Sequence, residues 1–374
     1  MTKKIVIKIG SSTLTTAEGK VDLDFLSMIT AQIAKIKKAG WQPVIVTSAA
    51  IACGLEALGI KERPSDIPSL QAAASVGQNA LATAYAKSFA PFGIVTSLVL
   101  LTRRETADRK SYLHARDTFQ RLLDFDVVPI VNENDTVSVE QIRFGDNDTL
   151  AALVACLINA DLVVVLSDID GLYDKDPRAF DDAQIISQVS AIDQKVIGSA
   201  GKPGSAFGSG GMITKITAAR VLMVAGIEMV ICDGTRKNSL VDIVAGEAVG
   251  TRFVAAEKPH EITPRKLWIA LGDSAKGTLV VDAGAKAALI NQGGSLLSVG
   301  VAEIEGSFEI DDIVDIKDSS GHLFARGRVG IASTELTQSF SHQEKVGKTE
   351  KNSCISNGLS NKPIVHRDDL VIFE

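Results

Sequence analysis

The sequence predicts an α/β fold, with an open, mainly parallel sheet sandwiched by helices, followed by a small, mainly β C-terminal domain. Over the first 250 residues, apolar runs of Val, Ile and Leu alternate with longer amphipathic stretches. These runs are continuous rather than interrupted by polar residues, which is typical of parallel strands buried on both faces by helices. After residue 250, short β-like segments follow one another closely, separated by Gly- and Asp-rich turns.

The elements of the first domain, expected over residues 1–256, follow from these runs. The expected strands are the apolar runs at 5–9, 43–47, 93–101, 127–132, 162–167 and 228–232. The expected helices are the amphipathic or alanine-rich stretches near 23–39, 69–89, 112–125, 149–160 and 212–225. Gly40 ends the first of these helices, because glycine readily takes the backbone conformation that closes a helix.

A polar segment with two prolines at 257–266 indicates a linker, and the second domain is expected over 267–374. Its expected strands lie at 268–271, 277–281, 295–301, 307–316, 322–330 and 363–373, with one helix at 282–291. Residues 338–361 are rich in Ser, Lys and Asn, which predicts a mobile stretch.

The composition restricts the possible classes of function. Of the 374 residues, 45% are hydrophobic and 22% are charged, which is typical of a globular chain. The net charge of −6 disfavours a protein that binds mainly nucleic-acid phosphates. No apolar run reaches the roughly 18 residues of a membrane span. The four cysteines form no CxxC pair, so we expect buried, reduced thiols in a cytoplasmic protein.

Two segments have the composition of an anion-binding site. Lys8 ends the first expected strand and precedes Gly10-Ser11-Ser12, so that turn amides, hydroxyls and a lysine can face an anion. Six glycines between Gly198 and Gly211 precede a helix that carries Lys215. These are the parts of a phosphate cradle, although the spacing is not that of a Walker A motif. The alternatives are a solvated strand end and a glycine loop without a ligand.

Further polar segments follow apolar strands, where open α/β sheets bind ligands. The small residues Thr47-Ser48-Ala49-Ala50 would let a ligand approach the backbone, or would pack as a tight turn. Asn132-Glu133-Asn134-Asp135 and Gly145-Asp146-Asn147-Asp148 suit an amine-bearing substrate, a metal ion or the orientation of lysines. Asx clusters are also ordinary turn formers. Ser167-Asp168 begins an Asp-rich turn whose spacing is not that of a calcium-binding EF-hand.

Taken in this order, the motifs resemble the amino acid kinase family. The resemblance covers nearly the whole chain and rests on Lys8-x-Gly10-Ser11-Ser12, Thr47-Ser48-x-Ala50-Ile51-Ala52, the Asn-Glu-Asn-Asp run, Gly145-Asp146-Asn147-Asp148 and Gly-Gly-Met-x-Thr-Lys. Within the family, the chain is most similar to the members that phosphorylate L-glutamate as the first step of proline biosynthesis. One departure is Ala49, where the family usually has glycine. Its methyl group would crowd a backbone contact to the substrate or force a different backbone dihedral.

The resemblance implies transfer of the γ-phosphoryl group of ATP, with Mg²⁺, to the side-chain carboxylate of glutamate. It implies catalytic roles for Lys8, Lys215 and Asp148, with Asp148 holding the two lysines in place. It implies a glutamate site made by Ser48, Asp135, Asn147, Asn134 and Ser11. It implies an ATP site made by Lys8, Gly10, Ser167, Asp168, Ser209, Gly210, Gly211, Met212, Ile213, Thr214 and Lys215. The motifs name no protein ligand for Mg²⁺.

The small β domain resembles a PUA domain, on Gly277-Thr278-Leu279-x-Val281-Asp282-x-Gly284-Ala285 and Phe324-Ala325-Arg326-Gly327. PUA-like modules elsewhere bind RNA, so an RNA-interacting protein is one alternative, which the acidic balance disfavours. A structural or regulatory domain is another, since members of the resembled family are often homo-oligomers inhibited by proline. Kinases of aspartate, acetylglutamate or a nucleotide monophosphate are a third alternative, which the cluster spacing and the β domain disfavour.

Overall fold

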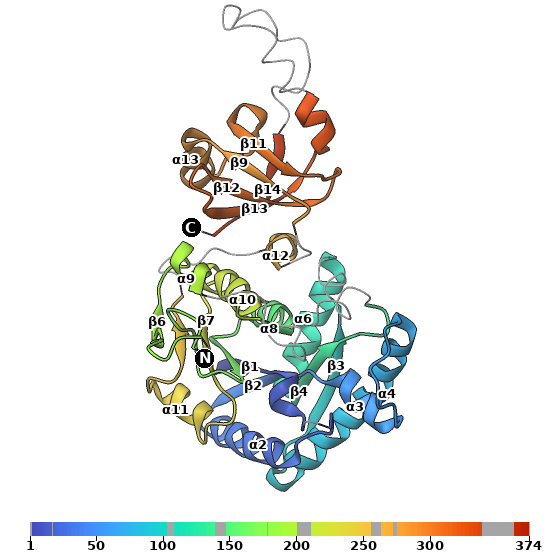
Figure 1. Ribbon diagram of the computed structural model, residues 1–374. Coiled ribbons are helices and arrows are strands. Elements are labelled where there is room, and N and C mark those ends of the chain that lie inside the picture. The colour runs from blue at the N-terminus through green and yellow to red at the C-terminus, as the bar shows by residue number, and fades with distance from the viewer. Residues whose placement is uncertain are drawn as a thin grey trace, which may run out of the picture. The chain divides into compact units, whose positions relative to one another are not determined.

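The computed structural model describes residues 2–16, 18–102, 108–138, 147–177, 179–199, 211–255, 263–271, 275–338 and 363–373. The chain forms two compact units, Met1–Glu261 and Ile262–Glu374. The first unit is an α/β structure and the second is mainly β (Figure 1). We propose that the boundary between the two domains lies within the expected linker at 257–266, whose last three residues begin a helix at Pro264. Residues 257–262 of that segment lie outside the described part of the chain.

The sheet of the first unit is open and mainly parallel, as predicted. Over the described residues its strands lie in the order β3 (Thr96–Leu101), β4 (Val128–Glu133), β2 (Trp41–Val46), β1 (Lys3–Ile9), β5 (Leu162–Ser167), β7 (Glu228–Asp233), β8 (Thr251–Phe253) and β6 (Gln188–Val189). Neighbours from β3 to β7 pair in parallel, whereas β8 runs antiparallel to β7. β1 is central, because it pairs with β2 on one side and with β5 on the other.

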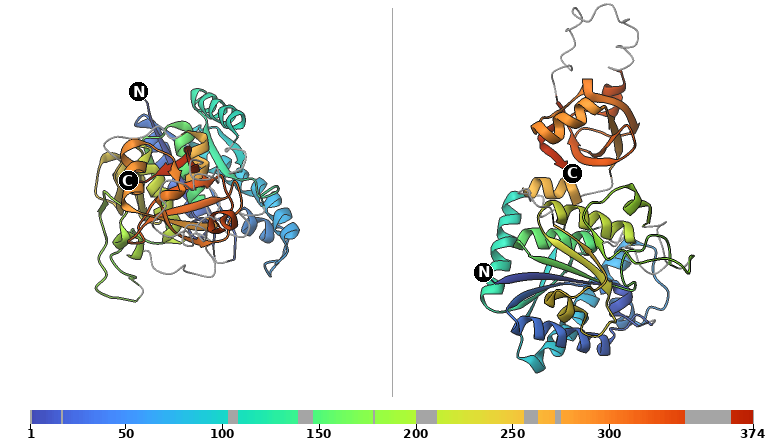
Figure 2. Two further views of the ribbon diagram at one scale, coloured as in Figure 1. Left: turned by 90° about the horizontal axis from the view of Figure 1, so that it is seen from above. Right: turned by 90° about the vertical axis from the view of Figure 1, so that its left-hand side faces the viewer.

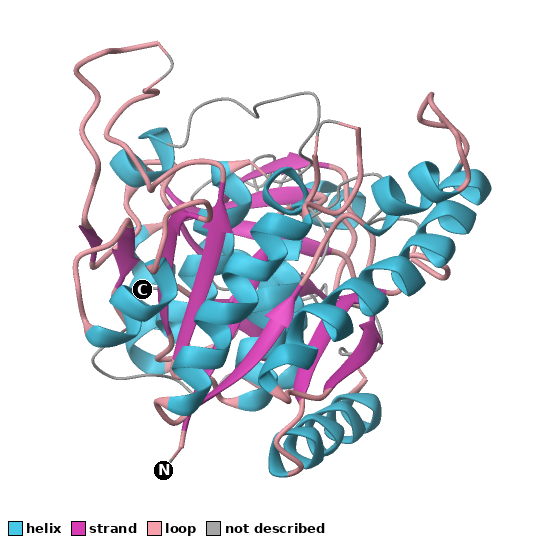
Figure 3. Cartoon of the chain, turned by 90° about the horizontal axis from the view of Figure 1, so that it is seen from below, coloured by secondary structure: helices cyan, strands magenta, loops and turns pink. Residues whose placement is uncertain are grey.

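Helices cover both faces of this sheet, as Figures 1 and 3 show. One face contacts α2 (Leu23–Lys38), α4 (Ile67–Phe89) and α11 (Ser239–Ala245). The other contacts α6 (Arg109–Asp124), α8 (Asn147–Ile158) and α10 (Met212–Val224). Successive side chains of a strand point to opposite faces of the sheet. Ile5, Val6 and Ile7 of β1 are all fully buried, so both faces of β1 are covered. The right-hand view of Figure 2 shows the strands between the two helix layers.

The segment after β2 continues as a helix, α3 (Ala50–Ala57), beyond the turn that its small residues predict. α3 packs on α4 with the two backbones in contact. A Cβ atom added to Gly54 would lie 1.7 Å from the carbonyl oxygen of Ala73, and one added to Gly77 would lie 1.8 Å from that of Ala50. Only glycine permits this approach, so Gly54 and Gly77 fix the position of α3 and of the turn before it.

The second unit contains the predicted β domain. Over its described residues the strands lie in the order β10 (Leu296–Leu297), β14 (Pro363–Ile372), β13 (Leu323–Val329), β12 (Ile313–Asp318), β9 (Gly277–Val281) and β11 (Val301–Gly306). β9 and β12 pair in parallel, and the other neighbours are antiparallel. The predicted helix is α13 (Ala283–Gln292), and Phe308 and Phe324 are buried in the core of the unit.

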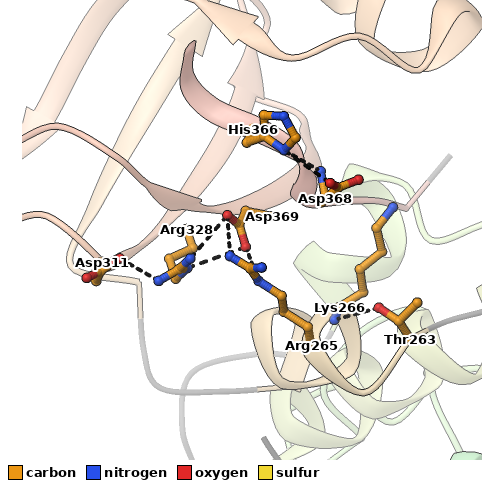
Figure 4. A network of polar contacts seen from close by, with 8 residues as sticks. All are labelled: Thr263, Arg265, Lys266, Asp311, Arg328, His366, Asp368 and Asp369. Carbon is orange, nitrogen blue, oxygen red and sulfur yellow. Dashed lines mark hydrogen bonds and ion pairs between the residues drawn. The ribbon is translucent and has the colours of Figure 1, made fainter. Parts of the chain in front are cut away.

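The prediction of a strand at 268–271 is wrong, because these residues end a helix, α12 (Pro264–Leu271). A four-residue apolar run does not distinguish a strand from a turn of a buried helix. Pro264 at the first helical position is the signal that favours the helix. Asp369 of β14 holds α12 by accepting a hydrogen bond from Arg265 of that helix at 2.7 Å. The same carboxylate also accepts from Arg328 of β13 at 3.2 Å (Figure 4).

The strand bounds differ most from the prediction at three other places. The strand predicted at 93–101 begins at Thr96, because Gly93 takes a φ of 66°. The strand predicted at 307–316 begins at Ile313, because Asp311 takes a φ of 74°. The strand predicted at 295–301 is divided into β10, the 3-10 helix η2 (Ser298–Gly300) and β11.

The cysteines bear out the prediction where they are described. Cys53, Cys156 and Cys232 are free and buried, and Cys354 lies outside the described residues. Within the described part of the chain, none of the helices combines the length and the apolar character that a membrane span requires. The stretch at 339–361 lies outside the described residues.

Candidate active site

The ends of parallel strands meet at one edge of the first sheet and carry many of the expected site residues. β1, β2 and β4 end beside Lys8, Ser48 and Asp135. α8 begins at the same edge, with Asn147 and Asp148 in its first turn. The chain adds strands β2, β3 and β4 on one side of β1 and then β5 and β7 on the other side, so the strand order reverses at β1. Open α/β sheets bind ligands at the carboxyl ends of the strands where the order reverses.

Asp148 joins two lysines that are far apart in the sequence. Lys8 Nζ lies 2.8 Å from Asp148 Oδ1, and Lys215 Nζ lies 3.2 Å from Oδ2. Thr214, at the start of α10, donates a hydrogen bond from its hydroxyl to Oδ2 at 2.8 Å. The side chain of Asp148 has no exposed surface, and each lysine side chain is less than one tenth exposed. The structure therefore brings all three expected catalytic residues together in one desolvated cluster.

The cluster carries a net positive charge, because two ammonium groups share one carboxylate. Burial acts to raise the pKa of Asp148, but the charges of Lys8 and Lys215 and the hydrogen bonds from Lys8 and Thr214 outweigh it. They hold that pKa well below its usual range, so the carboxylate stays ionised. Positive charge fixed in a desolvated site binds and stabilises an anion such as a phosphate group.

Asn147, the residue before Asp148, connects α8 to two strand ends. Its Nδ2 donates to the carbonyl oxygen of Thr47 at 2.6 Å, to Ser48 Oγ at 2.9 Å and to Asn132 Oδ1 at 3.1 Å. Because Nδ2 faces these acceptors, Oδ1 of the same amide points the other way. An oriented amide and a hydroxyl are thus held one residue from the charged cluster.

Asp135 follows β4 and carries a carboxylate with altered acidity. The residue is 9% exposed, and burial raises its pKa to about 6, against the opposing charge of Arg63. A buried carboxylate of this kind is stabilised by a cation placed beside it. Asn134 lies at the same strand end, where its backbone N–H donates to the carbonyl oxygen of Leu101 at 2.8 Å. Ser11 begins α1 (Ser11–Leu14) directly after β1.

The residues expected to contact ATP lie at the ends of β1 and β5 and at the start of α10. A Cβ atom on Gly10 would lie 3.8 Å from Lys8 Nζ, so the side chain of Lys8 extends along the chain toward the turn at Gly10. Ser167 is buried at the end of β5, 3.2 Å from Oδ1 of the exposed Asp168. The residues that open α10 before Lys215 are Gly211, Met212, Ile213 and Thr214. The expected residues that lie outside the described part are Ser209, Gly210, Gly145 and Asp146.

The comparison with known proteins agrees with this geometry. The amino acid kinase family matches residues 3–233 of the chain. This chain belongs to the amino acid kinase family. The PUA domain matches residues 277–345, so the amino acid kinase fold and the C-terminal PUA domain predicted from the sequence are confirmed.

Curated relatives match over almost the whole length. A protein named glutamate 5-kinase from Caldanaerobacter subterraneus subsp. tengcongensis is 42% identical over 371 residues, which are 99% of this chain and 98% of that protein. Proteins of the same name from Carboxydothermus hydrogenoformans and Microcystis aeruginosa are 42% and 41% identical over 376 and 374 residues. These alignments cover 100% of this chain and 98% and 97% of those proteins.

In this member of the amino acid kinase family, Ala49 takes a backbone conformation that suits glycine. It precedes α3 with φ 75° and ψ 10°, in the left-handed region. Glycine takes this conformation freely, whereas alanine is strained there by about 1–2 kcal/mol. The two expectations for Ala49 were a crowded backbone contact to the substrate and a different backbone dihedral. The structure informs the second, because Ala49 takes a left-handed dihedral.

We expect Ala49→Gly to leave the free energy of unfolding unchanged or to raise it by up to about 1 kcal/mol, because relief of the strain offsets the lost methyl group and the greater freedom of unfolded glycine. The matched control is Ala34→Gly, at a buried position in the middle of α2. This control should cost about 1–2 kcal/mol. Urea unfolding of both variants measures the difference, and equal losses would show that position 49 is unstrained.

Two residues that hydrogen bonds connect to the expected site, Asn132 directly and Gln78 through Asn132, are absent from the set that the family resemblance implies. Asn132 accepts a hydrogen bond from Asn147, and Gln78 of α4 bonds in turn to Asn132 at 3.1 Å. A signal for Gln78 is present in the sequence. It occupies the same helix face as Leu70, Ala74 and Leu81, where a polar side chain needs a buried partner.

Proposed function

We propose that this chain transfers the γ-phosphoryl group of ATP to the side-chain carboxylate of L-glutamate, which is the first step of proline biosynthesis. One observation carries the proposal: Asn147 and Asp148 are consecutive, and they hold an oriented amide beside a buried, positively charged pair of lysines. The names of the relatives, which align over nearly the full chain, support the same reaction.

On the nucleotide side, Lys8 and Lys215 contact the phosphates and stabilise the charge that develops during transfer. Asp148 is a positioning residue for both lysines, because it pairs with each of them. The remaining members of the proposed ATP site are Gly10, Ser167, Asp168, Ser209, Gly210, Gly211, Met212, Ile213 and Thr214. Among the described residues no three His, Cys, Asp or Glu gather as metal ligands. We propose that Mg²⁺ arrives bound to the phosphates, as it does in many sites.

On the acceptor side, the Asp135 carboxylate pairs with the ammonium group of glutamate, and Asn147 and Ser48 bind its polar groups. Asn134 and Ser11 support this site from the ends of β4 and β1. A cationic ligand group fits Asp135, whose burial makes an isolated negative charge unfavourable there.

The chemistry needs positioning and electrostatics rather than proton transfer. A side-chain oxygen of glutamate attacks the γ-phosphorus, the bond to the β,γ-bridging oxygen breaks, and ADP leaves with the electron pair. The attacking carboxylate is already ionised at pH 7, so no general base is required. The barrier comes from bringing two anions together, and two lysines that converge on the transferred group lower it.

The first test is an assay of the full chain with ATP, Mg²⁺ and L-glutamate, in which hydroxylamine traps the acyl phosphate as a hydroxamate. We expect hydroxamate to form only when glutamate is present, and we expect ADP to be released in the same amount as the hydroxamate. Aspartate, N-acetylglutamate and a nucleotide monophosphate serve as the comparison panel. Folded protein that makes no hydroxamate but releases ADP with another member of this panel would contradict the proposal.

We also propose that proline inhibits the enzyme and that the chain forms a homo-oligomer, with the PUA domain in a structural or regulatory role. An RNA-binding role for that domain is disfavoured by its charge, since residues 277–345 hold five Lys and Arg against ten Asp and Glu. Adding proline to the hydroxamate assay and measuring the mass in solution by light scattering test the first two points.

The pKa of Asp135 predicts the pH dependence of glutamate use. Since the pKa is about 6, the ionised fraction falls from about 90% at pH 7 to about 10% at pH 5. We expect kcat/KM for glutamate to fall nearly tenfold over this range, with a smaller change in kcat/KM for ATP. In Asp135→Asn the glutamate value should be low and should not follow the same titration. A wild-type value that stays constant from pH 7 to pH 5 would remove Asp135 from the ammonium site.

A further inference from the structure

Gln78 begins a chain of buried amides that ends at the expected glutamate site. Its Nε2 donates to the carbonyl oxygen of Glu133 at 3.1 Å, and its Oε1 accepts from Asn132 Nδ2 at 3.1 Å. Asn132 Oδ1 accepts from Asn147 Nδ2 at 3.1 Å. Gln78, Asn132 and Asn147 are all less than one tenth exposed. The chain therefore links α4, β4 and the first turn of α8 away from water.

The direction of every hydrogen bond in this chain is fixed by the backbone of Glu133. The carbonyl oxygen of Glu133 can only accept, so the Nε2 side of Gln78 must face it and Oε1 must face Asn132. The backbone N–H of Glu133 can only donate, and it lies 2.9 Å from Asn132 Oδ1. Asn132 is held from both ends, so it presents an acceptor to Asn147, which must then donate.

We propose that Gln78 is a positioning residue for glutamate binding, which acts through Asn132 to fix the way the Asn147 amide faces. This inference rests on the proposed function, in which Asn147 and Ser48 bind glutamate. Turning the Asn147 amide over would place its oxygen against the carbonyl oxygen of Thr47, 2.6 Å from the present Nδ2, and would remove the donor to Ser48 Oγ. Gln78 adds to this preference, because its Oε1 accepts from Asn132 Nδ2 and so keeps Asn132 Oδ1 facing Asn147.

The position of Gln78 depends on the close packing of α3 and α4. The preceding residue, Gly77, is where the backbone of α4 touches that of α3 at Ala50. The turn before Ala50 holds Thr47 and Ser48, whose carbonyl oxygen and hydroxyl also accept from Asn147. The contact between α3 and α4 therefore affects the place of Gln78 and of these two acceptors.

The test is Gln78→Met, which keeps the length of the side chain but removes its donor and acceptor. Without Gln78 the buried Nδ2 of Asn132 loses its acceptor, which is unfavourable. We expect KM for glutamate to rise about tenfold, the effect of about one hydrogen bond, with KM for ATP within about twofold of wild type. Should Gln78→Met fail to fold, Gln78→Asn, whose shorter amide cannot reach both partners, should change KM in the same direction.

Gln32→Met is the matched control, because Gln32 is equally buried but serves a different junction. Its Nε2 donates to Met28 Sδ at 2.8 Å, and its Oε1 accepts from the backbone N–H of Leu240 at 3.0 Å. This variant should lose a comparable amount of thermal stability and leave both KM values unchanged. If the two variants have the same KM for glutamate, Gln78 has a structural role only and the proposal is overturned.

A double-mutant cycle tests the route through Asn132. If Gln78 acts through Asn132, then Gln78→Met should raise KM for glutamate far less in an Asn132→Leu background than in the wild type. Additive effects would contradict this route. Asn147→Ala distinguishes the role of Asn147 in binding glutamate from the role of Gln78 in positioning it. An unchanged KM for glutamate in this variant overturns both proposals. A raised KM in Asn147→Ala with a normal KM in Gln78→Met overturns this inference alone.

Discussion

Lys215→Ala should lower kcat by about a thousandfold or more and leave the protein folded. The ammonium group of Lys215 is desolvated beside Asp148 Oδ2, and it is placed to meet charge that develops on the transferred phosphoryl group. Removal of one preorganised group of this kind costs about 10²–10³ in rate, and cationic groups in phosphoryl transfer cost more. Asp148 keeps its ion pair with Lys8 at 2.8 Å, so the buried carboxylate is not left alone. Steady-state kinetics with circular dichroism as the folding check measures the effect.

Lys8→Ala should behave in the same way, and the double variant should lose less than the product of the two single losses, because both lysines act on one group. Lys4→Ala is the matched control on the same strand. Lys4 Nζ bonds to Gln120 and to the carbonyl oxygen of Ile158, at the opposite end of β1. Its kcat should stay within about twofold of wild type. Near-normal turnover in Lys215→Ala would refute the role of the lysine pair.

Gly77→Ala should have the largest effect on stability, a loss of about 3 kcal/mol or more in the free energy of unfolding. The added Cβ would lie 1.8 Å from the carbonyl oxygen of Ala50 and 2.7 Å from the backbone nitrogen of Gly54. Neither neighbour can move away by rotating a side chain, so α3 and α4 must separate, and overpacking of this kind costs 1–3 kcal/mol or more. Because α3 follows the turn that holds Ser48, KM for glutamate should rise as well.

Gly59→Ala is the control for this effect. Gly59 lies just after α3 with a φ of 69°, and an added Cβ would meet nothing within 4 Å. The substitution should cost about 1 kcal/mol from the backbone conformation alone. Urea unfolding of both variants gives the comparison, and a loss in Gly77→Ala as small as in Gly59→Ala would show that the helix pair adjusts freely.

Continuous apolar runs predicted the strands and the layered architecture of this fold well, because a strand buried on both faces needs such a run. The 5–9 run became part of β1, with Ile5 to Ile7 fully buried. Short elements escaped prediction where local composition is ambiguous. The run at 268–271 is equally apolar in a strand and in a helix. Pro264 before it favours the helix, and contacts with β14 and β13 hold α12 in place.

The site was predictable in part, for a physical reason. Lys8, Asp148 and Lys215 are distant in sequence, and no spacing between them reveals that they meet. Local composition indicated Lys8 and Lys215 as parts of an anion site, and their catalytic roles together with Asp148 came from the family resemblance. The Asx clusters were visible because polar residues follow apolar strands. Gln78 was missed although its place on the apolar face of a helix marks it as a buried polar residue, because its two partners come from β4 and the sequence does not show that contact.

The central place of β1 in the sheet has a consequence for the order in which the protein assembles during synthesis. β1 leaves the ribosome before the other described strands of its sheet. Its neighbour β2 follows soon after, but β5, on its other side, is complete only at Ser167. A nascent chain can therefore build the sheet outward from β1 on one side well before the other side exists. Such a chain contains both Lys8 and Asp148, whereas the second lysine arrives only with α10. No N-terminal fragment that stops before Lys215 can hold the complete charged cluster.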